Sequence, residues 1–210
     1  MRTIGIIPIK SKSTRFPGKN FSDFNGKTLI VNTLEKMLKH IDTVFISTDD
    51  PISVTDMLKI YGYTTKEKFD LTDDIESGIY VLFRDEKLCQ PDTPTDDVIH
   101  DLIKKLSFFD EDYIIALCQV TSPLWKPHTL RYAIHRHECY KYEKTIISVS
   151  PDYKPNGCFY IFTKSKFLKY QQIYAPDLYL VVFDWKQCAD IDYAYQLFIA
   201  EAIARGDYDD

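Results

Sequence analysis

A short segment near the start of the amino-acid sequence concentrates basic side chains that could bind an anion. Five cations lie within it against the single carboxylate of Asp23, and these cations are Lys10, Lys12, Arg15, Lys19 and Lys27. Such a segment, with neighbouring hydroxyl groups, could surround a triphosphate with charge-assisted hydrogen bonds. A solvated basic loop is an equal alternative on composition alone, because Gly18 is the only glycine of residues 10–20 and the spacing does not fit a Walker A loop.

Two carboxylates near the end of the sequence could bind a metal ion. Asp190 and Asp192 are separated by one residue and stand directly before a predicted helix. Carboxylates in this arrangement can hold a hydrated Mg²⁺ against phosphate oxygens. In the alternative interpretation, Asp192 caps the helix and Asp190 is an ordinary loop residue. Asp49 and Asp50 are weaker metal candidates, since Asp50 can cap a helix that begins at the following proline.

The elements that must position these residues alternate between strands and helices. Apolar, β-branched runs predict strands at 3–9, 43–47, 79–83, 113–118, 145–149, 156–162 and 178–183. Apolar spacing and capping residues predict helices at 28–40, 51–61, 95–106, 193–204 and within 127–142. Residues 62–78 are polar and are predicted to form a surface excursion. This alternation predicts an α/β fold, a mostly parallel sheet flanked by helices, in a single domain over residues 1–210.

Composition limits the classes of function that the chain can serve. A formal net charge of -5 over 210 residues argues against a general nucleic-acid binder. No stretch approaches the roughly 20 continuous apolar residues of a membrane span, and the opening MRTIGIIPI does not resemble a secretory signal. Five widely spaced cysteines without a C-x-x-C pair fit reduced thiols. We therefore predict a cytoplasmic protein with neither a membrane nor a nucleic acid as partner.

Six segments follow one another along the chain, and they are IIPIKSKSTRFPGKNF with FNGKTLI, FISTDD, LCQPDTPTDDVIHDLI, CQVTSPL, KPNGCFYIF and DIDYAYQLFIAEAI. Together these segments resemble the sugar-acid cytidylyltransferases, the family of CMP-sialic acid and CMP-3-deoxy-octulosonate synthetases. The resemblance implies a Rossmann-like nucleotide-diphospho-sugar transferase fold. It also implies a Mg²⁺-dependent transfer of CMP from CTP to a small, sialic-acid-like sugar acid with release of pyrophosphate, and it allows a homodimer.

The resemblance also assigns roles to individual residues. The catalytic positions are Arg15, Lys19, Asp190 and Asp192. Among them, Lys19 balances charge on the departing pyrophosphate, and Asp190 and Asp192 hold the metal. The nucleotide-binding positions are Lys10, Ser13, Arg15, Lys19, Asn20, Arg84, Thr95 and Asp96. The acceptor-binding positions are Gln119, Thr121, Ser122, Lys154 and Asn156.

The chain departs from the family pattern at four places. Lys10 replaces an arginine, Asp96 replaces a small hydroxyl residue, and Trp125 replaces another arginine, although its indole could stack on a sugar ring. Only residues 151–153 stand where the family inserts a long arm that helps to form the dimer and reaches the acceptor carboxylate. Two alternatives therefore stay open: a GT-A-like glycosyltransferase that uses a nucleotide sugar, and a non-catalytic nucleotide-binding protein.

Overall fold

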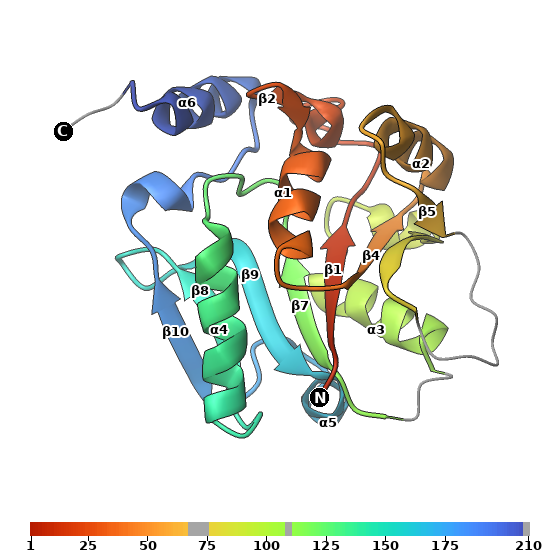
Figure 1. Cartoon of the computed structure of the whole chain (residues 1–210), viewed down its shortest axis with the longest axis vertical. Helices are drawn as coiled ribbons and strands as arrows, with labels where there is room; N and C mark the ends of the chain where they lie inside the picture. The colour runs from red at the N-terminus through yellow and green to blue at the C-terminus, as the bar shows by residue number, and fades with distance from the viewer. Residues whose placement is uncertain (67–75, 108–110, 208–210) are drawn as a thin grey trace.

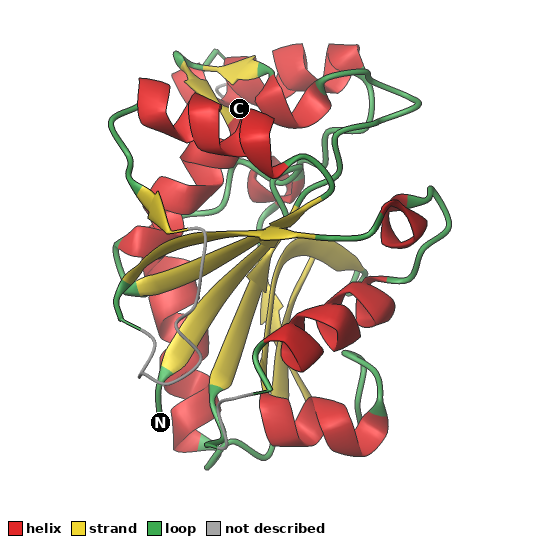
Figure 2. Cartoon of the chain, turned by 90° about the vertical axis from the view of Figure 1, so that its right-hand side faces the viewer, coloured by secondary structure: helices red, strands yellow, loops and turns green. Residues whose placement is uncertain are grey.

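The computed structural model describes residues 1–66, 76–107 and 111–207, and the described residues form a mixed sheet of eight strands between two layers of helices (Figures 1 and 2). In spatial order the strands are β10 (Leu178–Val182), β8 (Thr145–Val149), β9 (Pro155–Thr163), β7 (Ile114–Cys118), β1 (Thr3–Pro8), β4 (Thr43–Thr48), β6 (Gly78–Phe83) and β5 (Thr65–Lys66). Neighbouring strands are parallel except for β9, which runs antiparallel to both β7 and β8. The predicted α/β fold with a mostly parallel sheet is confirmed.

Helices bury apolar side chains against both faces of the sheet. One face packs against α1 (Leu29–Leu38), α2 (Pro51–Ile60) and α4 (Pro127–Cys139), and the other against α3 (Thr95–Lys105) and α5 (Lys164–Tyr170). Successive residues of a strand point to opposite faces, so Ile6 and Ile7 of β1 belong to separate cores. None of the helices in the described ranges has the length and apolar character needed to cross a bilayer.

The last helix, α6 (Ala194–Arg205), lies beyond the carboxyl ends of the strands (Figure 1). Beside it is a hairpin of β2 (Asp23–Phe24) and β3 (Lys27–Thr28), and the Asn25 amide in the hairpin turn donates to the Glu201 carboxylate at 3.3 Å. The β2–β3 hairpin and the last helix, which are far apart in the sequence, therefore meet at the same edge of the sheet (Figure 1). This is the edge where ligands bind in open α/β folds.

Most of the predicted elements are confirmed within one or two residues, and the differences have physical causes. The predicted cap of α2 is present, because the Asp50 carboxylate accepts from the Ser53 amide at 3.0 Å. Helix α5 was not predicted, since it follows β9 without a turn and is too short to show helical spacing. Within the predicted excursion at 62–78, Thr65–Lys66 pairs with β6, while residues 67–75 lie outside the described ranges. The 3-10 turns η1 (Lys19–Phe21), η2 (Glu86–Cys89) and η3 (Trp185–Cys188) were not predicted either.

Candidate active site

The segment that follows β1, residues 10–20, is the basic loop, and Asp49 fastens its start to the end of β4. One carboxylate oxygen of Asp49 accepts from the Ser11 amide and the other from the Ser11 hydroxyl, both at 2.7 Å. The two bonds fix the backbone and the side chain of Ser11 together. Asp49, a weaker metal candidate in the sequence, is thus already engaged in holding the basic loop.

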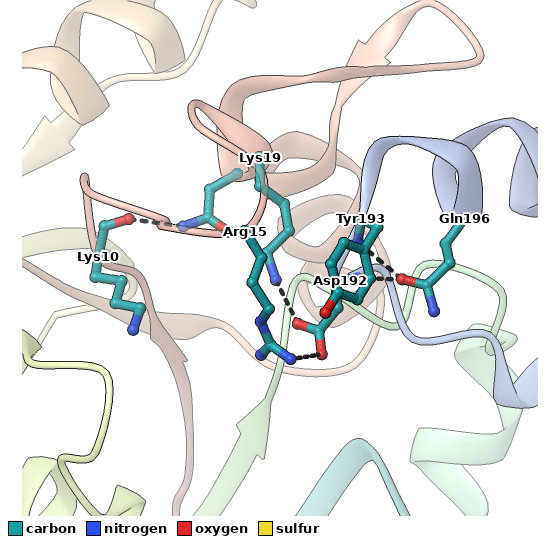
Figure 3. A network of polar contacts seen from close by, with 7 residues as sticks. Lys10, Arg15, Lys19, Asp192, Tyr193 and Gln196 are labelled. Atoms are coloured by element: carbon teal, nitrogen blue, oxygen red, sulfur yellow. Dashed lines mark hydrogen bonds and ion pairs between the residues drawn. The ribbon is translucent and has the colours of Figure 1, made fainter.

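Two buried polar side chains hold the backbone of the same region. Arg84, which follows β6 and is 3% exposed, donates to the Ile9 carbonyl at 2.5 Å. Asn20, which is 7% exposed, donates to the Lys10 carbonyl at 2.8 Å, the bond drawn from Lys10 in Figure 3. Buried carbonyl groups need a donor, so these bonds stabilise the path of the chain between β1 and η1.

A pocket of about 190 Å³ lies between the basic loop and the ends of β6 and β7. Eight of the predicted site residues line it, and they are Lys10, Ser13, Lys19, Asn20, Arg84, Thr95, Gln119 and Thr121. Among the described residues that line the pocket, three carry a positive charge and none carries a negative charge. The pocket is therefore suited to an anionic ligand.

A cluster of opposite charges joins the basic loop to the segment before α6 (Figure 3). Asp192 binds the Arg15 guanidinium at 2.9 Å through one oxygen and the Lys19 ammonium at 3.0 Å through the other. Arg15 also stands over the ring of Tyr193, 5.7 Å from its centre. The Lys19 side chain is only 11% exposed, so its charge is partly shielded from water and depends more on its partner than a surface lysine would.

The carboxylate of Asp192 pairs with these cations, and the side chain of Gln196 holds the backbone just before α6. The Gln196 side-chain oxygen accepts from the Asp192 amide at 2.7 Å and from the Tyr193 amide at 2.8 Å (Figure 3). The cap of α6 is Tyr193, so the alternative interpretation in which Asp192 caps the helix is wrong. The role of Gln196 was missed, although a glutamine three residues after the cap is the spacing of a capping box.

Asp190 lies close to Asp192, and opposing interactions act on the pKa of its carboxylate. The Thr121 hydroxyl donates to its carboxylate, and the Ile191 amide donates to the Thr121 carbonyl at 2.8 Å. Although water reaches the residue, crowding by protein atoms raises the pKa of Asp190, and the charge of Asp192 raises it further. The bond from Thr121 and the charges of Lys19 and Arg15 act in the opposite direction.

The donor set of Asp190 and Asp192 fits a hard divalent cation. The charges of the two carboxylates interact, and the pKa of Asp190 is raised. A nearby positive charge therefore stabilises the ionised form of both carboxylates. Within the described residues, no group of three or more His, Cys, Asp or Glu side chains could hold a metal ion. The two aspartates would therefore bind a cation such as Mg²⁺ together with water and ligand oxygens, as Mg²⁺ commonly is bound.

Four of the other predicted site residues are engaged elsewhere and do not line the pocket. The Asp96 carboxylate accepts from the Ile173 amide at 2.9 Å. Ser122 is fully buried and donates to the Asn156 carbonyl at 3.1 Å, while the Asn156 amide group contacts Cys188 at 3.3 Å. Lys154 is exposed and pairs with the neighbouring Asp152.

Trp125 is also a departure from what the sequence suggested. Its side chain is 1% exposed and belongs to the core, so the indole does not stack on a bound sugar ring. The link between β8 and β9 is as short as the sequence indicates, since only residues 150–154 separate the two strands.

Sequence comparisons find relatives over most of the chain. Residues 4–78 match the family model described as cytidylyltransferase. The CMP-N,N'-diacetyllegionaminic acid synthase of Legionella pneumophila is 32% identical over 165 residues, which are 75% of this chain and 62% of that protein. The 3-deoxy-manno-octulosonate cytidylyltransferase of Francisella tularensis is 29% identical over 177 residues, 79% of this chain and 60% of that protein. The chain thus spans less than two thirds of the length of either relative.

Solved structures share the fold. CMP:2-keto-3-deoxy-manno-octonic acid synthetase, complexed with CTP, superimposes with a TM-score of 0.70 over 99% of this chain and 100% of that chain, at 13% identity. A 4-diphosphocytidyl-2C-methyl-D-erythritol synthase from Anaerococcus prevotii superimposes with a TM-score of 0.63 over 97% of this chain and 98% of that chain, at 12% identity. The fold is therefore the Rossmann-like fold of these enzymes.

Proposed function

We propose that the chain is a cytidylyltransferase that transfers CMP from CTP to a hydroxyl group of a sugar acid and releases pyrophosphate, because residues 4–78 match the cytidylyltransferase family model and a CMP-N,N'-diacetyllegionaminic acid synthase is 32% identical over 75% of this chain. The single observation that carries this proposal is the cluster of Arg15, Lys19 and Asp192 at the edge of a pocket lined by cations. A nucleoside triphosphate needs positive charge along its phosphates, and this is where the chain concentrates it.

On the nucleotide side, we propose that the pocket binds CTP. Lys10, Ser13 and Lys19 would contact the phosphates, and Asn20, Arg84 and Thr95 would contact the nucleoside. Thr95, which lines the pocket, is a better candidate for base contacts than Asp96, whose carboxylate holds the Ile173 amide. Lys19 and Arg15 would exchange Asp192 for phosphate oxygens and balance the charge on the pyrophosphate as it leaves.

On the carboxylate side, we propose that Asp190 and Asp192 hold Mg²⁺. A bound Mg²⁺ supplies positive charge to phosphate oxygens and orients them for displacement. The protein residues prepare this arrangement themselves, since the Thr121 hydroxyl orients Asp190 and Gln196 fixes the backbone at Asp192.

The acceptor is proposed to be a sugar acid, either sialic-acid-like or octulosonate-like, because the relatives named above act on both kinds. Gln119 and Thr121 are placed to contact it from the end of β7. Ser122, Lys154 and Asn156 would have to give up their present partners to do so. We include in the proposal a single domain, a cytoplasmic location, which the five free thiols support, and a homodimer that would need a surface other than the family's long arm.

The test is the release of pyrophosphate from CTP, UTP, ATP and GTP with Mg²⁺ and a panel of sialic, legionaminic and octulosonic acids. We expect release with CTP and one class of acid. Transfer from a CMP-sugar without any use of triphosphate would instead favour a glycosyltransferase. Saturable CTP binding without turnover for any acid would indicate a non-catalytic nucleotide-binding protein. Either of these two results would contradict the proposal.

A further inference from the structure

Residues 119–125, which we call the acceptor turn, connect β7 to α4 and are held from three directions. The Ile191 amide donates to the Thr121 carbonyl at 2.8 Å from the segment before α6. Ser122 donates to the Asn156 carbonyl at 3.1 Å at the start of β9. The third attachment comes from α1, where the ammonium group of Lys36 donates to the Pro123 carbonyl. The turn is therefore fixed by parts of the chain that are far apart in the sequence.

Lys36 is placed in an unusual way for a lysine in a helix. It lies in the last turn of α1, on a face that packs towards the core, and its ammonium stands 5.2 Å from the centre of the Trp125 ring. Trp125 is 1% exposed, so the ring that receives this charge is itself in the core. A cation over an indole face is attractive, and the attraction grows as water is removed.

The charge on Lys36 works against folding. Burial lowers the pKa of Lys36 to about 8, although the thiols of Cys158 and Cys118 partly oppose the shift. The protonated form is thus less stable in the folded chain than in the unfolded chain, and an apolar side chain would avoid this penalty. Ionisable groups shifted in this way by burial are concentrated at functional sites.

We propose that Lys36 is a positioning residue that holds the acceptor turn, and with it Gln119 and Thr121, in the geometry that binds the sugar acid. This inference rests on the proposed function. Pro123 and Trp125 follow Thr121 within four residues, and the Thr121 hydroxyl in turn holds the Asp190 carboxylate. Movement of the turn would therefore disturb the acceptor contacts first and the paired aspartates second.

A second contact explains why the turn needs such support. Gly157 at the start of β9 has a φ of +76°, and a Cβ atom there would come within 2.6 Å of the Gln119 side-chain oxygen. The Gln119 side chain thus lies closely against the β9 backbone, where a small displacement of the turn would change its direction. Lys36 acts on the opposite end of the same turn.

The first experiment compares Lys36→Met with a matched control, Lys39→Met, which changes an exposed lysine at the end of the same helix. In Lys36→Met the KM for the sugar acid should rise about tenfold, as expected for one lost charge-assisted hydrogen bond. The KM for CTP should stay within about twofold of the parent, and the Tm at pH 7 should equal or exceed it. Lys39→Met should match the parent in all three values.

A positioning residue and a merely structural residue predict different results for Lys36→Met. Positioning predicts a higher KM for the sugar acid without a fall in Tm, whereas a structural role predicts a lower Tm. A parent-like KM for the sugar acid in Lys36→Met would overturn the inference, and so would a fall in Tm with equal losses for both substrates. Failure of the proposed function itself would be recognised differently, because the parent would then show no turnover with any acid. A parent that turns over while Lys36→Met behaves identically contradicts the inference alone.

A second readout does not depend on turnover. The sequence has two tryptophans, and Trp185→Phe leaves Trp125 as the only tryptophan, whose emission is excited selectively over that of the tyrosines. The groups that surround Lys36 are Lys39, Cys118 and Cys158, with Lys27, Glu35, Lys126, Asp184 and Lys186 around the adjoining pocket. Trp125 fluorescence should titrate with a midpoint near the Lys36 pKa of about 8, and Lys36→Met should remove the transition. A titration that survives in Lys36→Met would assign it to another group and contradict the contact.

Discussion

Two sides of the pocket, which we propose bind the nucleotide and the acceptor and call the nucleotide side and the acceptor side, are built in different ways. On the nucleotide side, one continuous loop and the neighbouring strand ends supply the residues, and six of the eight predicted positions line the pocket. On the acceptor side, only Gln119 and Thr121 of the five predicted positions do so. The first set follows the ends of neighbouring strands and stays in the pocket, whereas Ser122, Lys154 and Asn156 of the second set are engaged by other partners. The nucleotide side should therefore be sensitive to single charges, and the acceptor side to the residues that hold the turn.

The largest effect is expected from Lys19→Ala. This change removes a nearly buried cation that faces both the pocket and Asp192, and kcat/KM for CTP should fall about 100-fold to 1000-fold, as for the loss of one preorganised donor to a developing charge. Steady-state pyrophosphate release measures it. Lys12→Ala is the matched control, because the Lys12 side chain is 85% exposed and should leave kcat/KM unchanged. If both changes lowered kcat/KM equally, the cation that lines the pocket would have no greater role than the exposed one, which would contradict the prediction.

The next effect is expected from Asp192→Asn. The change keeps the size of the side chain but removes the charge that pairs with Arg15 and Lys19 and would bind Mg²⁺. We expect kcat to fall about 100-fold and the Mg²⁺ concentration for half-maximal activity to rise. Asp207→Asn removes an exposed pairing with Arg205 and serves as the control. An unchanged Mg²⁺ dependence in Asp192→Asn would exclude Asp192 as a metal ligand.

Asp49→Ala tests how the basic loop is held. Loss of the two bonds to Ser11 should raise the KM for CTP about tenfold and leave the KM for the sugar acid unchanged. Its neighbour provides the contrast, since Asp50→Ala removes a helix cap and should lower stability by about 1 kcal/mol without changing either KM. If Asp49→Ala affected both substrates equally, the two sides of the pocket would not be separately supported.

The smallest effect concerns the pH dependence of stability. The pKa of Lys36 falls from 10.5 in the unfolded chain to about 8 in the folded chain. The free-energy cost of burying the protonated lysine is therefore complete below pH 8 and decreases as pH rises towards 10.5. The amount by which the free energy of unfolding of Lys36→Met exceeds that of the parent should thus be largest near neutral pH and should decrease above pH 8. Urea unfolding at a series of pH values measures the difference. A difference that is constant with pH would show that Lys36 keeps an ordinary pKa.

Local patterns predicted most of the fold and the part of the pocket that the basic loop lines. The apolar run before Lys10 and the cap at Asp50 are signals within a few residues, and both elements form where they were expected. The basic loop follows β1 directly, so the position of Lys19 at the sheet edge could be predicted from the order of elements. The charge pattern did not show that its partner would be Asp192, which is 173 positions away.

Long-range packing decided the rest, and no local signal reports it. Asp96 and Asn156 have residue types suited to a ligand, yet the fold engages them with the Ile173 amide and with Cys188. Trp125 likewise could be read as a stacking surface until its burial under Lys36 was known. The role of Asp49 also depends on the neighbouring strand, because Ser11 lies 38 positions away in the sequence.

Calorimetric titration of CTP in the presence of Mg²⁺ tests the central claim most directly, namely that the basic loop and Asp192 form the nucleotide site. The parent and Lys36→Met should bind CTP with similar affinity, whereas Lys19→Ala should bind at least about tenfold more weakly, as the loss of one charge-assisted contact predicts. Parent-like CTP binding by Lys19→Ala, or no binding by the parent, would contradict the account.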